Sequence, residues 1–185
     1  GIELFRWTSV YLDGVQAMEF IPPPADRGDA EPPEGYLAVF DSISGMINLL
    51  RPSDGTFIDS FPAADPFFIE GLAYDPVNGI LFQLDDDVIH ATALGGSLRG
   101  GSLFTIPNPA AGNDFGGTGL TYVGDDTLVV ATTEGDWYVV SSDPSCSGAP
   151  LGGGPSCLLA SGNNGIDMWA LKFLEAPAGP GCVGD

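Results

Sequence analysis

Short apolar stretches alternate with turns along most of the chain. The stretches are about four to six residues long, and the turns between them are rich in Gly, Pro, Asn and Asp. This pattern is typical of antiparallel β-strands joined by tight turns. The expected strands fall into three groups of four: residues 15–21, 36–40, 46–50 and 56–61; residues 72–74, 80–84, 88–92 and 102–106; and residues 120–123, 127–132, 137–141 and 157–160.

A six-residue pattern marks the first strand of each group. It begins at Val15, Ile69 and Gly117, and once more at Ile166. Its second position is polar, its third small or apolar, its fourth large and apolar, and its last aromatic or Leu. The polar positions Gln16, Glu70, Thr118 and Asp167 are separated by 54, 48 and 49 residues. A period of about 50 residues that holds four strands is that of a propeller blade.

The phrase Ile69-Glu70-Gly71-Leu72-Ala73-Tyr74-Asp75-Pro76 resembles the opening strand of an NHL or gluconolactonase type of β-propeller blade. The resemblance covers roughly residues 15 to 174. No Trp-Asp dipeptide ends a blade and no double glycine marks a second strand, which disfavours the WD40 and Kelch repeat classes. The expected fold is therefore an all-β, propeller-like array of four-stranded blades, and a β-sandwich of many short strands is the alternative.

The number of blades in this array is unusual. Three units span residues 15–63, 69–107 and 117–161, within a repeat domain of residues 13–174. Residues 1–12 form one more strand, residues 165–174 begin a fourth unit, and residues 175–185 are a Pro/Gly-rich tail. A closed propeller has about four to eight blades, and here about three and a quarter are visible. We therefore expect an abbreviated fourth blade, or an open edge covered by another chain through strand addition.

Composition excludes several functions. The formal net charge is −20, with 5 Lys and Arg against 25 Asp and Glu, so nucleic acid and anionic membrane surfaces are unsuitable partners. The hydrophobic fraction of 44% is enough for a packed core, whereas 27 Gly and 16 Pro leave little room for long helices. No apolar run is long enough to span a membrane as a helix.

The cysteines indicate an oxidising compartment. Cys146 and Cys157 flank a Gly/Pro/Ser loop that has no metal-ligand spacing around it, which favours a local disulfide over two inert thiols. Cys182 is left over in the tail. It is a free thiol, a partner for a cysteine outside this sequence, or a cysteine for pairing between molecules.

Signs of nucleophilic or nucleotide chemistry are weak. The single histidine, His90, lies within an expected strand, where a sheet-face role is favoured over a catalytic one. The chain has no nucleophile elbow, P-loop, dinucleotide fingerprint or haem-attachment motif. No catalytic residue is therefore assigned.

The polar position of the repeat is the best candidate site. The first strands of propeller blades line a central channel, so Gln16, Glu70, Thr118 and Asp167 would converge there. The resemblance to gluconolactonase-like propellers implies a divalent cation at that point. Glu70 and Asp167, with Asn163 or Asn164, would supply the oxygen ligands that Ca²⁺ prefers. The alternative is that these groups only satisfy backbone polar atoms at the channel mouth.

The remaining acidic and aromatic residues are expected to have structural roles. The clusters at residues 85–87 and 125–126 and Asp136 fall in turns, where Asp bonds nearby backbone N–H groups. None of these clusters fits an EF-hand loop. The tryptophans Trp7, Trp137 and Trp169 and the tyrosines are expected on sheet faces in the core rather than on a carbohydrate-stacking platform.

Two functions follow from this sequence. The favoured one is a secreted or surface-displayed, non-catalytic module for assembly or adhesion, which associates with itself or another protein chain into an oligomer or filament. The alternative is a metal-dependent, lactonase-like propeller enzyme with a Ca²⁺ site at Glu70, Asp167 and Asn164.

Overall fold

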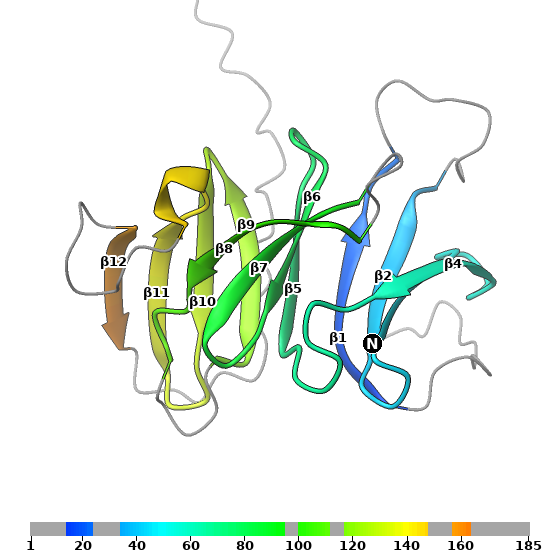
Figure 1. The fold of residues 1–185 in the computed structure, drawn as a ribbon, viewed down its shortest axis with the longest axis horizontal. Coiled ribbons are helices and arrows are strands. Elements are labelled where there is room, and N and C mark those ends of the chain that lie inside the picture. The colour runs from blue at the N-terminus through cyan, green and yellow to red at the C-terminus, as the bar shows by residue number, and fades with distance from the viewer. Residues whose placement is uncertain (1–13, 24–33, 95–99, 112–116, 148–156, 164–185) are drawn as a thin grey trace, which may run out of the picture.

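The computed structural model describes residues 14–23, 34–94, 100–111, 117–147 and 157–163. These residues form three four-stranded antiparallel sheets, each with its strands in chain order (Figure 1). The first sheet contains β1 (Val15–Ile21), β2 (Tyr36–Asp41), β3 (Met46–Leu50) and β4 (Phe57–Pro62). The second contains β5 (Gly71–Asp75), β6 (Ile80–Leu84), β7 (Val88–Ala93) and β8 (Ser102–Pro107). The third contains β9 (Gly119–Gly124), β10 (Thr127–Ala131), β11 (Asp136–Ser141) and β12 (Leu158–Asn163).

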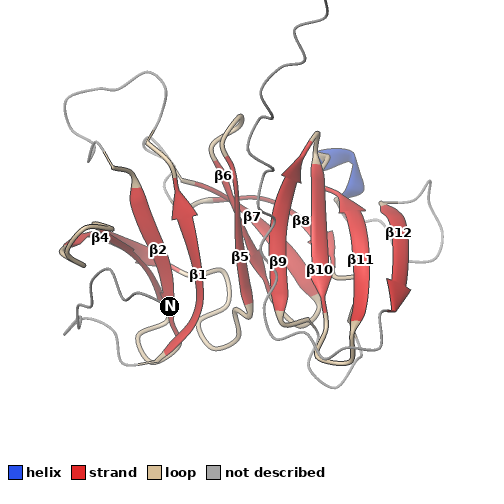
Figure 2. Ribbon diagram, turned by 180° about the vertical axis from the view of Figure 1, so that it is seen from behind, coloured by secondary structure: helices blue, strands red, loops and turns tan. Residues whose placement is uncertain are grey.

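The predicted all-β fold of four-stranded blades is confirmed. The three sheets stand side by side, and their first strands β1, β5 and β9 are neighbours in both views (Figures 1 and 2). β5 contacts both β1 and β9. Three sheets joined through their first strands form a propeller-like arrangement, which sets aside the β-sandwich alternative of two sheets packed face to face.

Alternating residues bury each sheet against the next. Ala17, Phe40 and Leu49 of the first sheet pack with Leu72 and Leu81 of the second in one core cluster. The next residues along β5 and β6 point the other way, because side chains alternate along a strand. A second cluster accordingly joins residues of the second and third sheets: Ala73, Phe82, Ile89, Leu128, Val130 and Val140. The second sheet is thus covered on both faces.

Aspartates terminate and shape the turns, as expected. Asp75 Oδ1 accepts hydrogen bonds from the backbone N–H groups of Val77 (2.8 Å) and Asn78 (3.2 Å) in the β5–β6 turn. In the β9–β10 turn, Asp125 and Asp126 have φ values of 48° and 52°. Positive φ at both central residues is what a tight I′ hairpin turn requires.

A disulfide joins Cys146 to Cys157, as predicted, with 5.6 Å between the Cα atoms. Cys146 ends a short 3₁₀ turn, η2 (Pro144–Cys146), and is buried in the second core cluster. Cys157 immediately precedes β12, the outermost strand of the third sheet. The bond therefore ties an edge strand with few buried residues to the body of the blade.

Several predicted features lie outside the described residues. These are the N-terminal strand at residues 1–12, the fourth unit at residues 165–174, the tail at residues 175–185, and Cys182. Trp7 and Trp169 also lie outside them, whereas Trp137 is half-buried on β11. None of the described parts of the chain contains a helix long and apolar enough to cross a membrane.

Candidate functional site

Glu70 stands where the chain enters the first strand of the second blade. Its backbone N–H donates to the carbonyl of Leu84 (2.9 Å), which extends the pairing of β5 with β6 by one residue. Thr118 holds the same place in the third blade, since its N–H donates to the carbonyl of Ala131 (2.7 Å). We call this side of the blades the entry end.

The carboxyl group of Glu70 is in an unfavourable place for a negative charge. Its Oε2 atom is buried and has no hydrogen-bond partner. Burial, followed by the negative charge of Asp86, raises the pKa of Glu70 to about 7, although a hydrogen bond from the Gly117 backbone opposes the shift. The group therefore keeps its proton to a higher pH than an exposed glutamate does.

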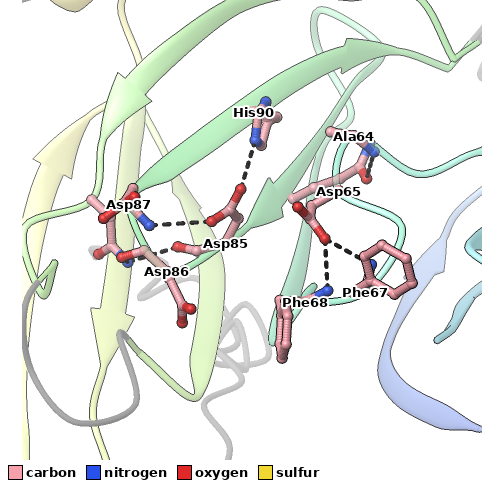
Figure 3. Close-up of polar contacts among 10 residues, drawn as sticks. Ala64, Asp65, Phe67, Phe68, Asp85, Asp86, Asp87 and His90 are labelled. Atoms are coloured by element: carbon pink, nitrogen blue, oxygen red, sulfur yellow. Dashed lines mark hydrogen bonds and ion pairs between the residues drawn. The ribbon is translucent and has the colours of Figure 1, made fainter.

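An acidic turn faces this carboxyl group. Asp85, between β6 and β7, accepts a hydrogen bond from the backbone of Asp87 (3.2 Å), and its Oδ2 lies 3.1 Å from His90 Nε2 (Figure 3). His90 is therefore paired with a carboxylate on the sheet face. The favoured interpretation of His90 as a sheet-face residue agrees with this position.

The connection from β4 to β5 presents aromatic side chains at the same end. Asp65 Oδ1 accepts hydrogen bonds from the backbone of Phe67 (2.7 Å) and Phe68 (2.9 Å), which fixes the loop (Figure 3). Both phenyl rings are largely exposed. The entry end therefore combines carboxylates with exposed aromatic surface.

Removing the charge of Glu70 should stabilise the protein at high pH. Because the folded-state pKa lies above the ordinary value of 4.5, the native state binds more protons, and its stability falls as pH rises from about 4.5 to 7. Glu70→Gln should therefore raise the free energy of unfolding by about 1 kcal/mol at pH 8, after discounting for solvent screening of this half-buried group.

The measurement is urea unfolding at pH 5 and pH 8 with a chelator present. At pH 5 the variant and the wild type should differ little. Glu134→Gln is the matched control, since it removes an exposed carboxylate from the β10–β11 turn. Equal effects of the two substitutions at pH 8 would contradict the assignment to the buried position of Glu70.

The other predicted members of the channel-mouth ring have different environments. Gln16 is exposed, and Thr118 is half-buried. Asp167 and Asn164 lie outside the described residues, and Asn163 on β12 donates to the Asp136 carboxylate (2.6 Å). No group of three His, Cys, Asp or Glu side chains suited to a metal occurs within the described ranges. Of the predicted calcium ligands, Glu70 and Asn163 are thus among the described residues, whereas Asp167 and Asn164 are not.

A pocket that sequence reasoning missed lies at the opposite side, where β1, β5 and β9 end. We call this side the exit end. The pocket has a volume of about 340 Å³, and its lining includes Phe20, Tyr74 and Tyr122. These three residues occupy the last position of the six-residue repeat. The aromatic end of the repeat was therefore a usable signal, because equivalent positions in neighbouring blades converge.

Acidic groups complete the pocket. Glu19 is only 7% exposed and lines the pocket from β1, and Asp125 lines it from the β9–β10 turn. The Tyr122 ring stacks on Phe82, with ring centroids 6.3 Å apart. Burial, followed by the nearby Asp75 carboxylate, raises the pKa of Tyr122, so its phenol stays neutral.

Comparison with solved structures agrees with this architecture. The chain is similar to the WD40 repeats of RRP9 (TM-score 0.53, 12% identity, covering 83% of this chain and 40% of that one). It is also similar to the Neurospora crassa Pan2 WD40 domain (TM-score 0.53, 10% identity, 86% and 41%) and to Kuenenia stuttgartiensis hydrazine synthase (TM-score 0.55, 11% identity, 92% and 41%). The sequence matches no protein-family model, and no curated protein matches it.

The three blades and these likenesses define a protein with a β-propeller-type repeat fold. At 10 to 12% identity the likenesses concern the fold alone. The chain spans about two fifths of the length of these structures. The three described blades thus correspond to part of a propeller.

Proposed function

We propose that this chain is a non-catalytic, propeller-like interaction module whose terminal blade faces bind another protein chain, in the first instance a second copy. The supporting observation compares equivalent repeat positions. Leu72 and Leu120 are each 2% exposed, because each packs against the preceding blade. The equivalent residue of the first blade, Met18, is 57% exposed.

The last position of the repeat behaves in the same way. Tyr74 and Tyr122 pack against the core clusters that join them to the preceding blades. Phe20, their counterpart in the first blade, is 45% exposed. The first blade therefore has an apolar face at the positions that a preceding blade covers elsewhere in the array.

The third blade has a partly uncovered apolar face on its other side, at the positions that a following blade would cover. Val129 and Val139 pair across β10 and β11, at the register positions that Phe82 and Ala91 occupy in the second blade. Phe82 and Ala91 are buried by the following blade, whereas Val129 and Val139 are only half-buried. Two copies joined through these faces would supply six blades, within the usual range of about four to eight.

Self-association of the full chain tests this proposal. Light scattering after size-exclusion chromatography should give at least twice the 19.1 kDa chain mass at micromolar concentration. Met18→Asp should shift this equilibrium at least about tenfold toward the monomer, because it would bury an unpaired charge in the contact. Ile43→Asp is the matched control, since Ile43 is 73% exposed in the β2–β3 turn.

A monodisperse monomer of wild-type protein would overturn self-association. A closed ring would give one defined oligomer, whereas a contact that does not close would give a filament. Electron micrographs distinguish these two forms. The same proposal places the module outside the cell or at its surface, with the disulfide and the high negative charge as support.

A second candidate function is the lactonase-like enzyme with Ca²⁺ at the entry end. Its support is the buried, unpartnered Oε2 atom of Glu70, together with the likeness of residues 69–76 to NHL and gluconolactonase blades. Asp167 and Asn164 would be the further ligands. Calorimetric titration with Ca²⁺ should then give heat with wild type and less with Glu70→Gln, and no heat in either would remove this candidate.

A further inference from the structure

The exit-end pocket has the chemistry of a site for positive charge. Three aromatic residues, Phe20, Tyr74 and Tyr122, line it from three different blades. Glu19 and Asp125 add carboxylates. None of the described lining residues is basic. Aromatic faces attract organic cations through their quadrupole, and carboxylates attract them by charge.

Glu19 differs from an exposed surface carboxylate because its side chain is almost fully buried. It lies on β1 between Ala17 and Ile21, two residues of the core, and is itself 7% exposed. Glu19 interacts with other groups of the protein, and it is also one of the residues that line the pocket.

The walls of the pocket are held in place by residues behind them. Asp75 is buried, and it is fixed by the backbone N–H of Val77 (2.8 Å) and the side chain of Asn78 (2.7 Å). Its carboxylate lies beside the Tyr122 phenol, whose ring stacks on Phe82. A rigid aromatic wall loses little entropy when a ligand binds.

We propose that the exit-end pocket binds an organic cation, an alkylammonium or guanidinium group, between the Glu19 and Asp125 carboxylates and the rings of Phe20, Tyr74 and Tyr122. The pocket is formed within one chain, and of the five residues named here only Phe20 also belongs to the exposed first-blade face proposed for self-association. It also lies at the opposite end of the strands from Glu70.

Calorimetric titrations of the full chain in 0.15 M salt test this site. The probes are N-acetyl-arginine methylamide, which presents guanidinium as a partner protein would, and choline as a free cation. N-acetyl-norleucine methylamide is the uncharged control. We expect at least one cation to bind and norleucine to give no heat. Tighter binding of the arginine derivative would indicate a protein side chain as the ligand, and tighter binding of choline would indicate a free small-molecule cation.

Two variants connect binding to the pocket. Glu19→Gln should weaken the affinity by more than about tenfold, because it replaces the more buried of the two carboxyl groups in the pocket lining. Asp125→Asn should weaken it by about threefold, as expected for an exposed carboxylate. Asn is well tolerated at positive φ, so Asp125→Asn keeps the test valid even if Glu19→Gln fails to fold.

Glu134→Gln controls for general negative charge, since it removes one exposed carboxylate from the β10–β11 turn at the entry end. Its affinity for the cation should equal that of the wild type. The proposal is overturned if neither cation binds at millimolar concentration, if norleucine binds equally well, or if Asp125→Asn has no larger effect than Glu134→Gln.

Discussion

Gly71→Ala should lower the free energy of unfolding by about 3 kcal/mol, at the upper end of what overpacking costs. Gly71 opens β5 at the point where this strand approaches β9 of the next blade. A Cβ atom at Gly71 would lie 2.8 Å from both Cβ and the backbone N of Leu120. Because one of these atoms is backbone, a rotamer change cannot relieve the clash, and the two strands would have to separate.

Urea or thermal unfolding measures this loss. Gly79→Ala is the control, because Gly79 has a φ of +66° in the β5–β6 turn and a Cβ there would meet nothing within 4 Å. That substitution should cost only the local strain of about 1 kcal/mol. A loss at Gly71 no larger than the loss at Gly79 would show that the inter-blade approach is not tight.

Removal of the Cys146–Cys157 disulfide should have a similarly large effect, about 3 kcal/mol. The bond closes a loop with a sequence separation of 11. By limiting the conformations of the unfolded chain, it raises the free energy of the unfolded state by roughly 3 kcal/mol. In the folded state it also holds β12, whose residues are mostly exposed. The loss should therefore appear first at this edge strand.

Unfolding of wild type with and without reductant measures the effect, and Cys146→Ser/Cys157→Ser should match the reduced wild type. Reductant should not affect that double variant. Hydrogen exchange of the amides in β12 should become faster than exchange in β9 and β10. Unchanged stability on reduction would contradict a structural role for the bond.

The strands were predictable because their signals are local. Short apolar stretches, bounded by turn residues such as Gly, Pro, Asn and Asp, located β1, β3 and β6 at their observed bounds. β12 was the least accurate prediction, since it extends to Asn163 rather than Ala160. That extension depends on pairing with β11, where Asn163 lies opposite Asp136, and such a contact between distant residues leaves no local pattern.

The candidate site was only partly predictable. The polar repeat position drew attention to Glu70, but neither its buried oxygen nor its raised pKa follows from the sequence. The raised pKa arises first from burial and then from the charges of Asp86 and Asp85 on another turn, whereas a hydrogen bond from Gly117 in the next blade opposes it. The exit-end pocket was missed because the aromatic repeat position was interpreted only as core.

The sequence by itself determined the repeat, the strands, the acidic turns and the cysteine pair, because each depends on residues close together in the chain. Only the tertiary structure decided which repeat positions are covered. Leu72 and Met18 hold the same place in the pattern, yet the first is buried and the second is exposed. The difference arises because a blade's face is buried by its neighbour, and the identity of that neighbour is not encoded within the blade itself.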